Sequence, residues 1–189
     1  FDLVLAIVLV AVIMLLFLHS LRNAMIVMIA IPASLIATFI GMALMGFSLN
    51  LMSLIALSLV VGILVDDAIV VIENIYRHME MGKNRVRASI DGAKEIGFTV
   101  ISITLVIVVV FLPISLSGSM VAMILREFCL VVVIAVLLSL VTSFTLVPLM
   151  TSRFGKLEHI KGNNAGGKFI LWFEKQIEKF TNWIGSLLK

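Results

Sequence analysis

Long runs of apolar residues dominate the chain, and short polar stretches separate them. Crossing a bilayer takes about 20 apolar residues in a helix. Five runs approach or exceed this length, at about residues 3–18, 24–45, 49–75, 96–116 and 128–150. Only helices and closed barrels span bilayers, because every backbone N–H and C=O group must find a partner within the protein. The pattern therefore predicts an all-α integral membrane protein, with a five-helix transmembrane bundle over residues 1–153.

Composition supports the membrane class. The 189 residues are 62% hydrophobic and 13% charged, whereas soluble domains are nearer half apolar and a quarter charged. The net charge of +3 is too small to indicate a nucleic-acid partner. The single cysteine, Cys129, cannot form an intrachain disulfide and is expected to serve packing. Three prolines fall in or near the ends of the apolar runs, where we expect kinks or helix ends: Pro32, Pro113 and Pro148.

The basic residues predict the orientation of the bundle. All of the 14 Lys and Arg residues except Arg126 lie after the first, third or fifth apolar run. Because cytoplasmic loops carry an excess of Lys and Arg, this side should be cytoplasmic. The N-terminus then faces outward and the C-terminus inward. An outward N-terminus without a signal peptide, in a chain that starts at Phe1, leads us to expect at least one further helix upstream.

A different pattern follows the fifth run. Residues 154–167 form a polar, glycine-rich linker, predicted to be cytoplasmic. Over residues 168–189, apolar side chains recur at steps of three and four, with lysines and glutamates between them. This spacing predicts an amphipathic helix. Trp172, Trp183 and the interspersed lysines suit the headgroup layer of the inner leaflet, so we expect an interfacial helix. A helix packed on a cytoplasmic domain is the alternative.

Two adjacent carboxylates interrupt the third run, in the stretch GILVDDAIVVIEN at 62–74. On the insertion scale, each aspartate at the centre of a membrane helix costs about 2.5–3.5 kcal/mol. Close together in a low dielectric, Asp66 and Asp67 should not both ionise freely, and they would titrate as a coupled unit. Intramembrane acids commonly serve proton relays. The pair is therefore predicted to bind the transported proton.

Neighbouring residues extend this polar feature. Glu73 and Asn74 follow Asp66 and Asp67 by seven residues, close to two helical turns, and should repeat their sector of the helix. Gly62, one turn earlier, should let another helix approach closely. Two alternatives stay open for the pair: a hydrogen-bonded or ion-paired lock between helices, and a Na⁺ site. No basic residue lies deep in any apolar run, so a charge partner must come from elsewhere.

The motifs resemble one family along essentially the whole chain. GILVDDAIVVIENIYRHMEMG is similar to the fourth transmembrane helix of resistance–nodulation–division (RND) efflux pumps. The segments that follow match in order and spacing, and so does the segment upstream. They read ASIDGAKEIGFTVISITL, VVVFLPISLSG, ILREF and SLVTSFTLVPLM, and upstream IPASLIATFIGMALMGFSLNLMSLIALSLVVGILVDD.

The resemblance implies a larger assembly. RND pumps have twelve transmembrane helices in two halves and exchange protons for substrates across the bacterial inner membrane. The five runs are similar to helices two to six of the first half, and residues 168–189 to the surface helix that joins the halves. The family's paired aspartates match Asp66 and Asp67, and their lysine partner belongs to the second half. A homotrimer, a periplasmic adaptor and an outer-membrane channel are the implied partners.

The multidrug branch fits best, because it usually carries both acids. The heavy-metal branch more often keeps one. Methionine pairs that could bind soft metals are more typical of packing: Met25/Met28, Met42/Met45 and Met120/Met123. Relatives that export lipids or assist secretion are further alternatives, as is a scaffold that does not transport. The sequence contains no nucleophile triad, phosphate-binding loop or metal-ligand cluster. We therefore expect no enzyme, and no cofactor other than the coupling protons.

Overall fold

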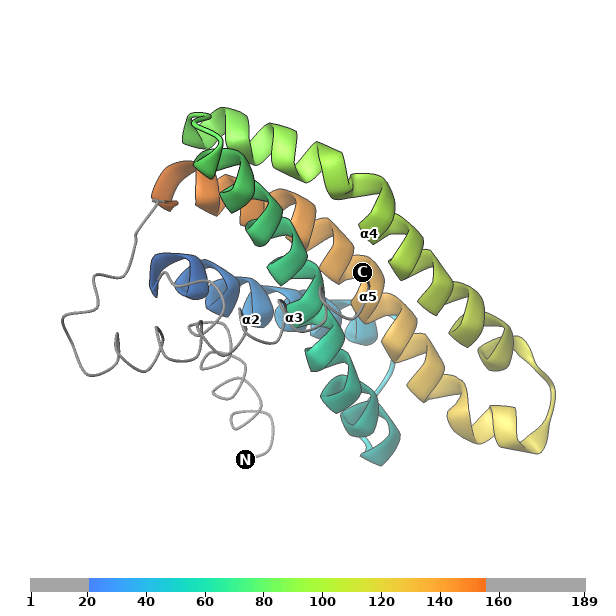
Figure 1. Ribbon diagram of the computed structural model, residues 1–189. Helices are drawn as coiled ribbons and strands as arrows, with labels where there is room; N and C mark the ends of the chain where they lie inside the picture. Colours follow the sequence, from blue (N-terminus) through green and yellow to red (C-terminus); the bar gives the residue numbers. More distant parts are fainter. Residues whose placement is uncertain (1–20, 156–189) are drawn as a thin grey trace, which may run out of the picture.

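The computed structural model describes residues 21–155. Over this range the chain is helical and contains no strand (Figure 1). The four helices are α2 (Leu21–Leu44), α3 (Leu51–Glu80), α4 (Arg85–Leu116) and α5 (Met120–Phe154). All four are long and apolar enough to cross a membrane. The predicted first run, the rest of the linker from residue 156 and the amphipathic helix lie outside the described residues.

The helices are longer than the apolar runs that predicted them. α3 continues past Ile75 to Glu80, and α4 begins at Arg85, well before the apolar run starts at Ile96. Residues 117–127, between the fourth and fifth apolar runs, are mostly helical, because α5 already begins at Met120. Hydropathy identifies the residues suited to hydrocarbon, whereas a helix continues until its backbone hydrogen bonds are capped.

Capping residues account for where the helices begin. Asn50 accepts a hydrogen bond from the Ser53 backbone N–H, and the Ser53 hydroxyl oxygen accepts one from the Asn50 N–H, which completes a capping box before α3. Asn84 caps α4 by accepting hydrogen bonds from the N–H groups of Val86 and Arg87, and Ser119 caps α5 by accepting one from the Ala122 N–H. Between α3 and α4, Gly82 adopts φ 87°, a conformation that favours glycine and lets the chain reverse.

The prolines lie within helices. Pro32 is inside α2, Pro113 is inside α4, and α5 continues beyond Pro148 to Phe154. Neighbouring helices and hydroxyl side chains can satisfy the carbonyls that a proline frees in a membrane helix. These prolines therefore do not mark the helix ends.

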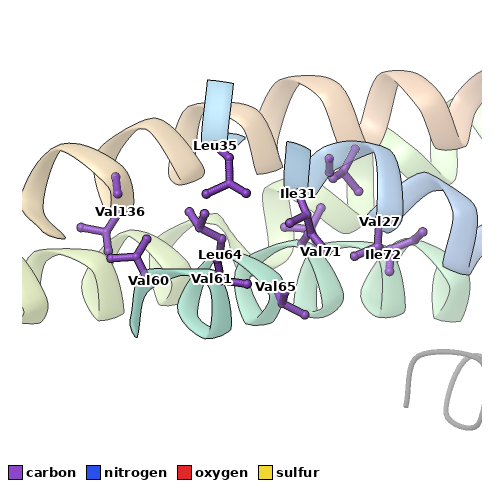
Figure 2. Close-up of a cluster of buried hydrophobic side chains, with 14 of the residues drawn as sticks. Val27, Ile31, Leu35, Val60, Val61, Leu64, Val65, Val71, Ile72 and Val136 are labelled. Atoms are coloured by element: carbon purple, nitrogen blue, oxygen red, sulfur yellow. The ribbon is translucent and has the colours of Figure 1, made fainter. Parts of the chain in front are cut away.

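Packing places α3 and α5 at the centre of the described bundle. Each of them contacts all three other helices, and α4 runs beside α5 (Figure 1). Figure 2 shows the apolar core where α2, α3 and α5 meet. It includes Val27, Ile31 and Leu35 of α2, Val60, Val61, Leu64, Val65, Val71 and Ile72 of α3, and Val136 of α5. Within this part of the chain α3 is the most buried helix and α4 the least, so the aspartates sit on the most enclosed element.

Candidate functional site

The two aspartates lie near the middle of α3, but their surroundings differ. Asp67 is only 7% exposed, whereas Asp66 is exposed. Adjacent residues on an α-helix point about 100° apart, so packing one against a neighbouring helix leaves the other outside that contact. The pair is therefore asymmetric, with one carboxylate inside the described bundle and one on its surface.

Asp67 is held by a residue from α5. The Ser139 hydroxyl donates a hydrogen bond to Oδ2 of Asp67, with 3.0 Å between the two oxygens. Ser139 is fully buried. Most hydroxyls inside these helices bond instead to a carbonyl one turn earlier, as Thr142 and Thr151 do. Ser139 thus directs its proton across the helix interface, to the one buried carboxylate in the middle of α3.

Asp66 has no such partner. Within residues 21–155, no hydrogen bond or ion pair includes Asp66, and no ion pair includes Asp67. The salt bridges of this region lie at the ends of α3 and α4 next to their connecting turn. The described residues contain no group of three His, Cys, Asp or Glu side chains that could hold a metal ion. An uncompensated pair of acids at this depth can accept a proton or attract a cation from outside these helices.

The predicted sector repeats along α3, as the seven-residue spacing indicated. Asn74 lies on the packed side with Asp67, and its side-chain amide donates to the Gly92 carbonyl of α4 at 2.8 Å. Glu73 lies on the exposed side with Asp66. The four residues therefore form two columns along α3, and only the column of Asp67 and Asn74 faces the neighbouring helices.

The close helix approach predicted at Gly62 is not made by any of the described helices. A Cβ atom added there would meet nothing within 4 Å, so none of the described helices approaches closely at this position. Close approaches occur at other glycines, and at Gly92 of α4 the nearest atoms belong to the backbone of α3. Gly62 and Asp66 are one turn apart and both exposed, which places them together on the open side of α3.

The profile of the AcrB/AcrD/AcrF family matches residues 1–189, the full length of the chain. The chain belongs to this family. Three proteins named multidrug resistance protein MdtC are among its relatives. Those of Enterobacter sp. (strain 638) and Klebsiella pneumoniae (strain 342) are 43% and 42% identical over 97% of the chain. That of Salmonella schwarzengrund is 49% identical over 79% of it. The chain spans only 18%, 18% and 14% of these relatives' lengths, respectively.

Family membership confirms the resemblance found from the motifs. It identifies the chain as RND efflux sequence, and the names of the relatives support the multidrug branch. Together with the four apolar helices, it makes the chain a multi-pass membrane protein. RND proteins are transporters, so the expectation that this chain is not an enzyme is also supported.

Sequence reasoning missed Ser139. A signal for it existed, because Ser139 and Ser143 are spaced by one turn in an apolar run and both prove to be buried. Small hydroxyl residues in membrane helices often bond across helix interfaces. The spacing could have indicated a polar contact on α5, although nothing in it names Asp67 as the partner.

Glu127 of α5 contacts the N-cap residue of α3. The Asn50 side-chain amide donates to its carboxylate at 2.5 Å. The other carboxylate oxygen is buried and has no hydrogen-bond partner among the described residues. Asn50 therefore caps α3 and fastens the start of that helix to α5, far along the bundle from the aspartate pair.

Proposed function

We propose that this chain is part of a longer, proton-driven exporter of hydrophobic or amphiphilic compounds, in which Asp66 and Asp67 bind the coupling proton. The observation that carries the proposal is the asymmetric pair in mid-helix. One acid is buried against Ser139, the other is exposed, and neither has a cation among the described residues. The chain spans 18% of the length of its relative from Enterobacter, so in a protein of that length the rest of the sequence can supply the parts that this chain lacks.

In this proposal the two acids have different roles, because they face different sides of α3. Asp66, on the open side of α3, is placed to meet a basic group from a helix outside this chain, and the family resemblance implies a lysine there. Asp67, which is bonded to Ser139, would transmit the effect of this charge contact to α5. A hydroxyl can donate to an ionised carboxylate or accept from a protonated one, so Ser139 can serve both states.

Protonation would then change the forces between helices. A charged pair attracts a basic partner strongly at this depth, because the effective dielectric is low. Adding a proton removes charge, weakens that attraction and lets the helices separate or shift. Alternation between the two states would move these helices and, through them, the parts of the protein that line the substrate path. We propose that the substrate path lies in the larger part of the relatives' length, outside this chain.

The remaining features of the proposal follow from charge and resemblance. We place the protein in the bacterial inner membrane, with the α3–α4 turn and the end of α5 on the cytoplasmic side. In this fragment the N-terminus would be periplasmic. The lipid bilayer, a second half with the partner lysine, two further copies, a periplasmic adaptor and an outer-membrane channel are the proposed partners. Protons are the proposed coupling ion, with no bound cofactor.

A structural lock is the second candidate function for the pair. The bond between Ser139 and Asp67 ties α3 to α5 in the middle of the bundle, and this contact favours a lock. The two functions differ in what they require of the proton. A lock needs a hydrogen-bonding group of the right shape, which asparagine can supply. A proton carrier needs a group that ionises.

The deciding experiment uses a full-length pump that contains this segment, reconstituted in proteoliposomes under an imposed pH gradient. Dye efflux and proton flux are measured for wild type, Asp66→Asn and Asp67→Asn after equal folding is verified. Loss of both fluxes in either variant supports proton coupling. Near wild-type fluxes in both variants would mean a lock. Replacing the proton gradient by a Na⁺ gradient tests the Na⁺ alternative in the same vesicles.

A further inference from the structure

Glu95 is the meeting point of three side chains from α3. Arg77 donates to its Oε1 at 2.5 Å, while His78 and Asn74 reach its Oε2 at 2.6 and 3.2 Å. Lys83 donates to Nδ1 of His78 at 3.0 Å, so the ring proton belongs on Nε2, from which it points to Glu95. One carboxylate of α4 thus joins three donors that span a full turn of α3.

The charge of Glu95 is stable. This residue precedes the apolar part of α4, and hydrogen bonds from Arg77, His78 and Asn74 lower its pKa to about 2. The carboxylate therefore stays ionised at any pH at which the protein would work. A change of pH in that range does not break its three hydrogen bonds.

The backbones of the two helices also touch beside this cluster. A Cβ atom on Gly92 would lie 2.8 Å from Cα of Ile75, so only glycine allows this approach. The Gly92 carbonyl accepts the Asn74 amide at 2.8 Å. Glu95 lies one turn further along α4. Steric contact and hydrogen bonds therefore fix the two helices at the same place.

We call Glu95 and its three partners on α3 the clamp: Asn74, Arg77 and His78. Two of these partners lie on the same line along α3 as the buried Asp67. Asn74 and His78 follow Asp67 by seven and eleven residues, and at 100° per residue both return to within about 20° of its direction. Asn74 is roughly 10 Å from Asp67 along the axis, at 1.5 Å per residue. If α3 rotated so that Asp67 left Ser139, Asn74 and His78 would have to move past Glu95.

We infer that Glu95 is a positioning residue that sets the rotation of α3 and so keeps Asp67 against Ser139. The consequence for proton coupling rests on the proposed function. The positional claim itself does not, since it concerns where one side chain of α3 points. Any displacement of α3 during transport must then carry the beginning of α4 with it.

The test measures the environment of Asp67 directly in the full-length pump. In an Asp66→Asn background, a hydrophobic carbodiimide modifies Asp67, and the labelling rate at fixed pH is followed by mass spectrometry. Glu95→Ala should raise the rate by about threefold or more, which corresponds to roughly half a pH unit in the reactive fraction. Glu95→Gln keeps one acceptor oxygen and should give an intermediate rate.

Glu80→Ala is the matched control. It removes the same charge from the same end of the bundle, and Glu80 is exposed, with no hydrogen bond or ion pair recorded within residues 21–155. If Glu95→Ala labels no faster than Glu80→Ala, the positioning role is wrong. If Glu95→Ala does not fold, Arg77→Gln removes a single donor. It should still raise the rate, and an unchanged rate would overturn the inference.

Failure of this inference can be told apart from failure of the proposed function. Suppose that the aspartate variants lose both fluxes while labelling is insensitive to Glu95. Proton coupling then stands and the clamp does not. If the aspartate variants pump normally but labelling responds to Glu95, the clamp stands as a structural device.

Discussion

Replacing Ser139 by alanine tests the buried half of the site. The substitution removes one hydroxyl from a fully buried position, and with it the 3.0 Å bond to Asp67. It leaves almost no cavity, so the helix packing should persist. A hydrogen bond to a charged group contributes about 1.5–3 kcal/mol. The hydroxyl can also accept a bond from the protonated carboxyl, but a neutral bond contributes only about 0.5–1.5 kcal/mol. Losing the hydroxyl therefore favours the protonated form by the difference, about 1–1.5 kcal/mol, which corresponds to about one pH unit.

We expect the pH profile of proton flux to shift, with transport activity retained. In proteoliposomes of the full-length pump, the pH at which proton flux is half-maximal should rise by about one unit in Ser139→Ala. The direction follows because the hydroxyl stabilises the ionised carboxylate more strongly than the protonated carboxyl. Dye efflux is measured in the same vesicles, so that a change in coupling is separated from a change in total activity.

Ser143→Ala is the matched control. Ser143 lies one turn further along α5 and is also buried, but it makes no recorded hydrogen bond to Asp67. Its profile should stay at the wild-type position. Equal profiles for wild type, Ser139→Ala and Ser143→Ala would refute the reasoning, because the hydroxyl would then have no influence on proton binding.

Two further predictions concern how α3 is fastened at its ends. Gly92→Ala places a methyl group 2.8 Å from the Ile75 backbone, and we expect a loss of about 1–3 kcal/mol in stability, measured as a lower unfolding temperature in detergent. Asn50→Asp keeps the cap acceptor but sets a second carboxylate against Glu127, at a contact that is now 2.5 Å. It should lower the unfolding temperature at neutral pH, and acidification should restore it, because protonating one acid removes the repulsion. Gly97→Ala serves as the control for the first substitution, because its new Cβ would have only an ordinary 3.8 Å contact.

Two results would contradict the predictions for Gly92 and Asn50. If Gly92→Ala is as stable as Gly97→Ala, the helices can separate without cost, and the close approach does not fix them. If Asn50→Asp is destabilised equally at neutral and acidic pH, the loss comes from shape or capping. Repulsion between carboxylates would then not be the cause.

Much of the fold was predictable, since it depends on local composition. Each of the four described helices covers most of one predicted apolar run. The errors lie at the ends, where polar residues such as those before Ile96 continue the helix, and where Ser119 starts α5 earlier than hydropathy indicated. Hydropathy responds to solvent, whereas helix length depends on where backbone groups find caps.

The candidate site was predictable only in part. Two acids in a membrane helix are conspicuous, because their insertion cost is large wherever they point. Ser139 and Glu95 were not found, because their contacts join residues far apart in the chain. Ser139 is 72 positions from Asp67, and Glu95 is 17 positions from His78. None of the described helices approaches closely at Gly62, whereas α3 and α4 approach closely at Gly92, which sequence analysis did not single out.

The sequence by itself determined that the chain is a helical membrane protein of the RND family with an acidic pair in mid-helix. Hydrocarbon solubility, backbone hydrogen bonding and motif order can all be read without knowing which helices are neighbours. The tertiary structure decided which aspartate is buried, which hydroxyl meets it and which residue clamps α3. These helices are apolar around most of their circumference, with large hydrophobic side chains both buried and exposed. Periodicity therefore cannot say which side faces which neighbour, and only the packing of all the described helices against one another sets that rotation.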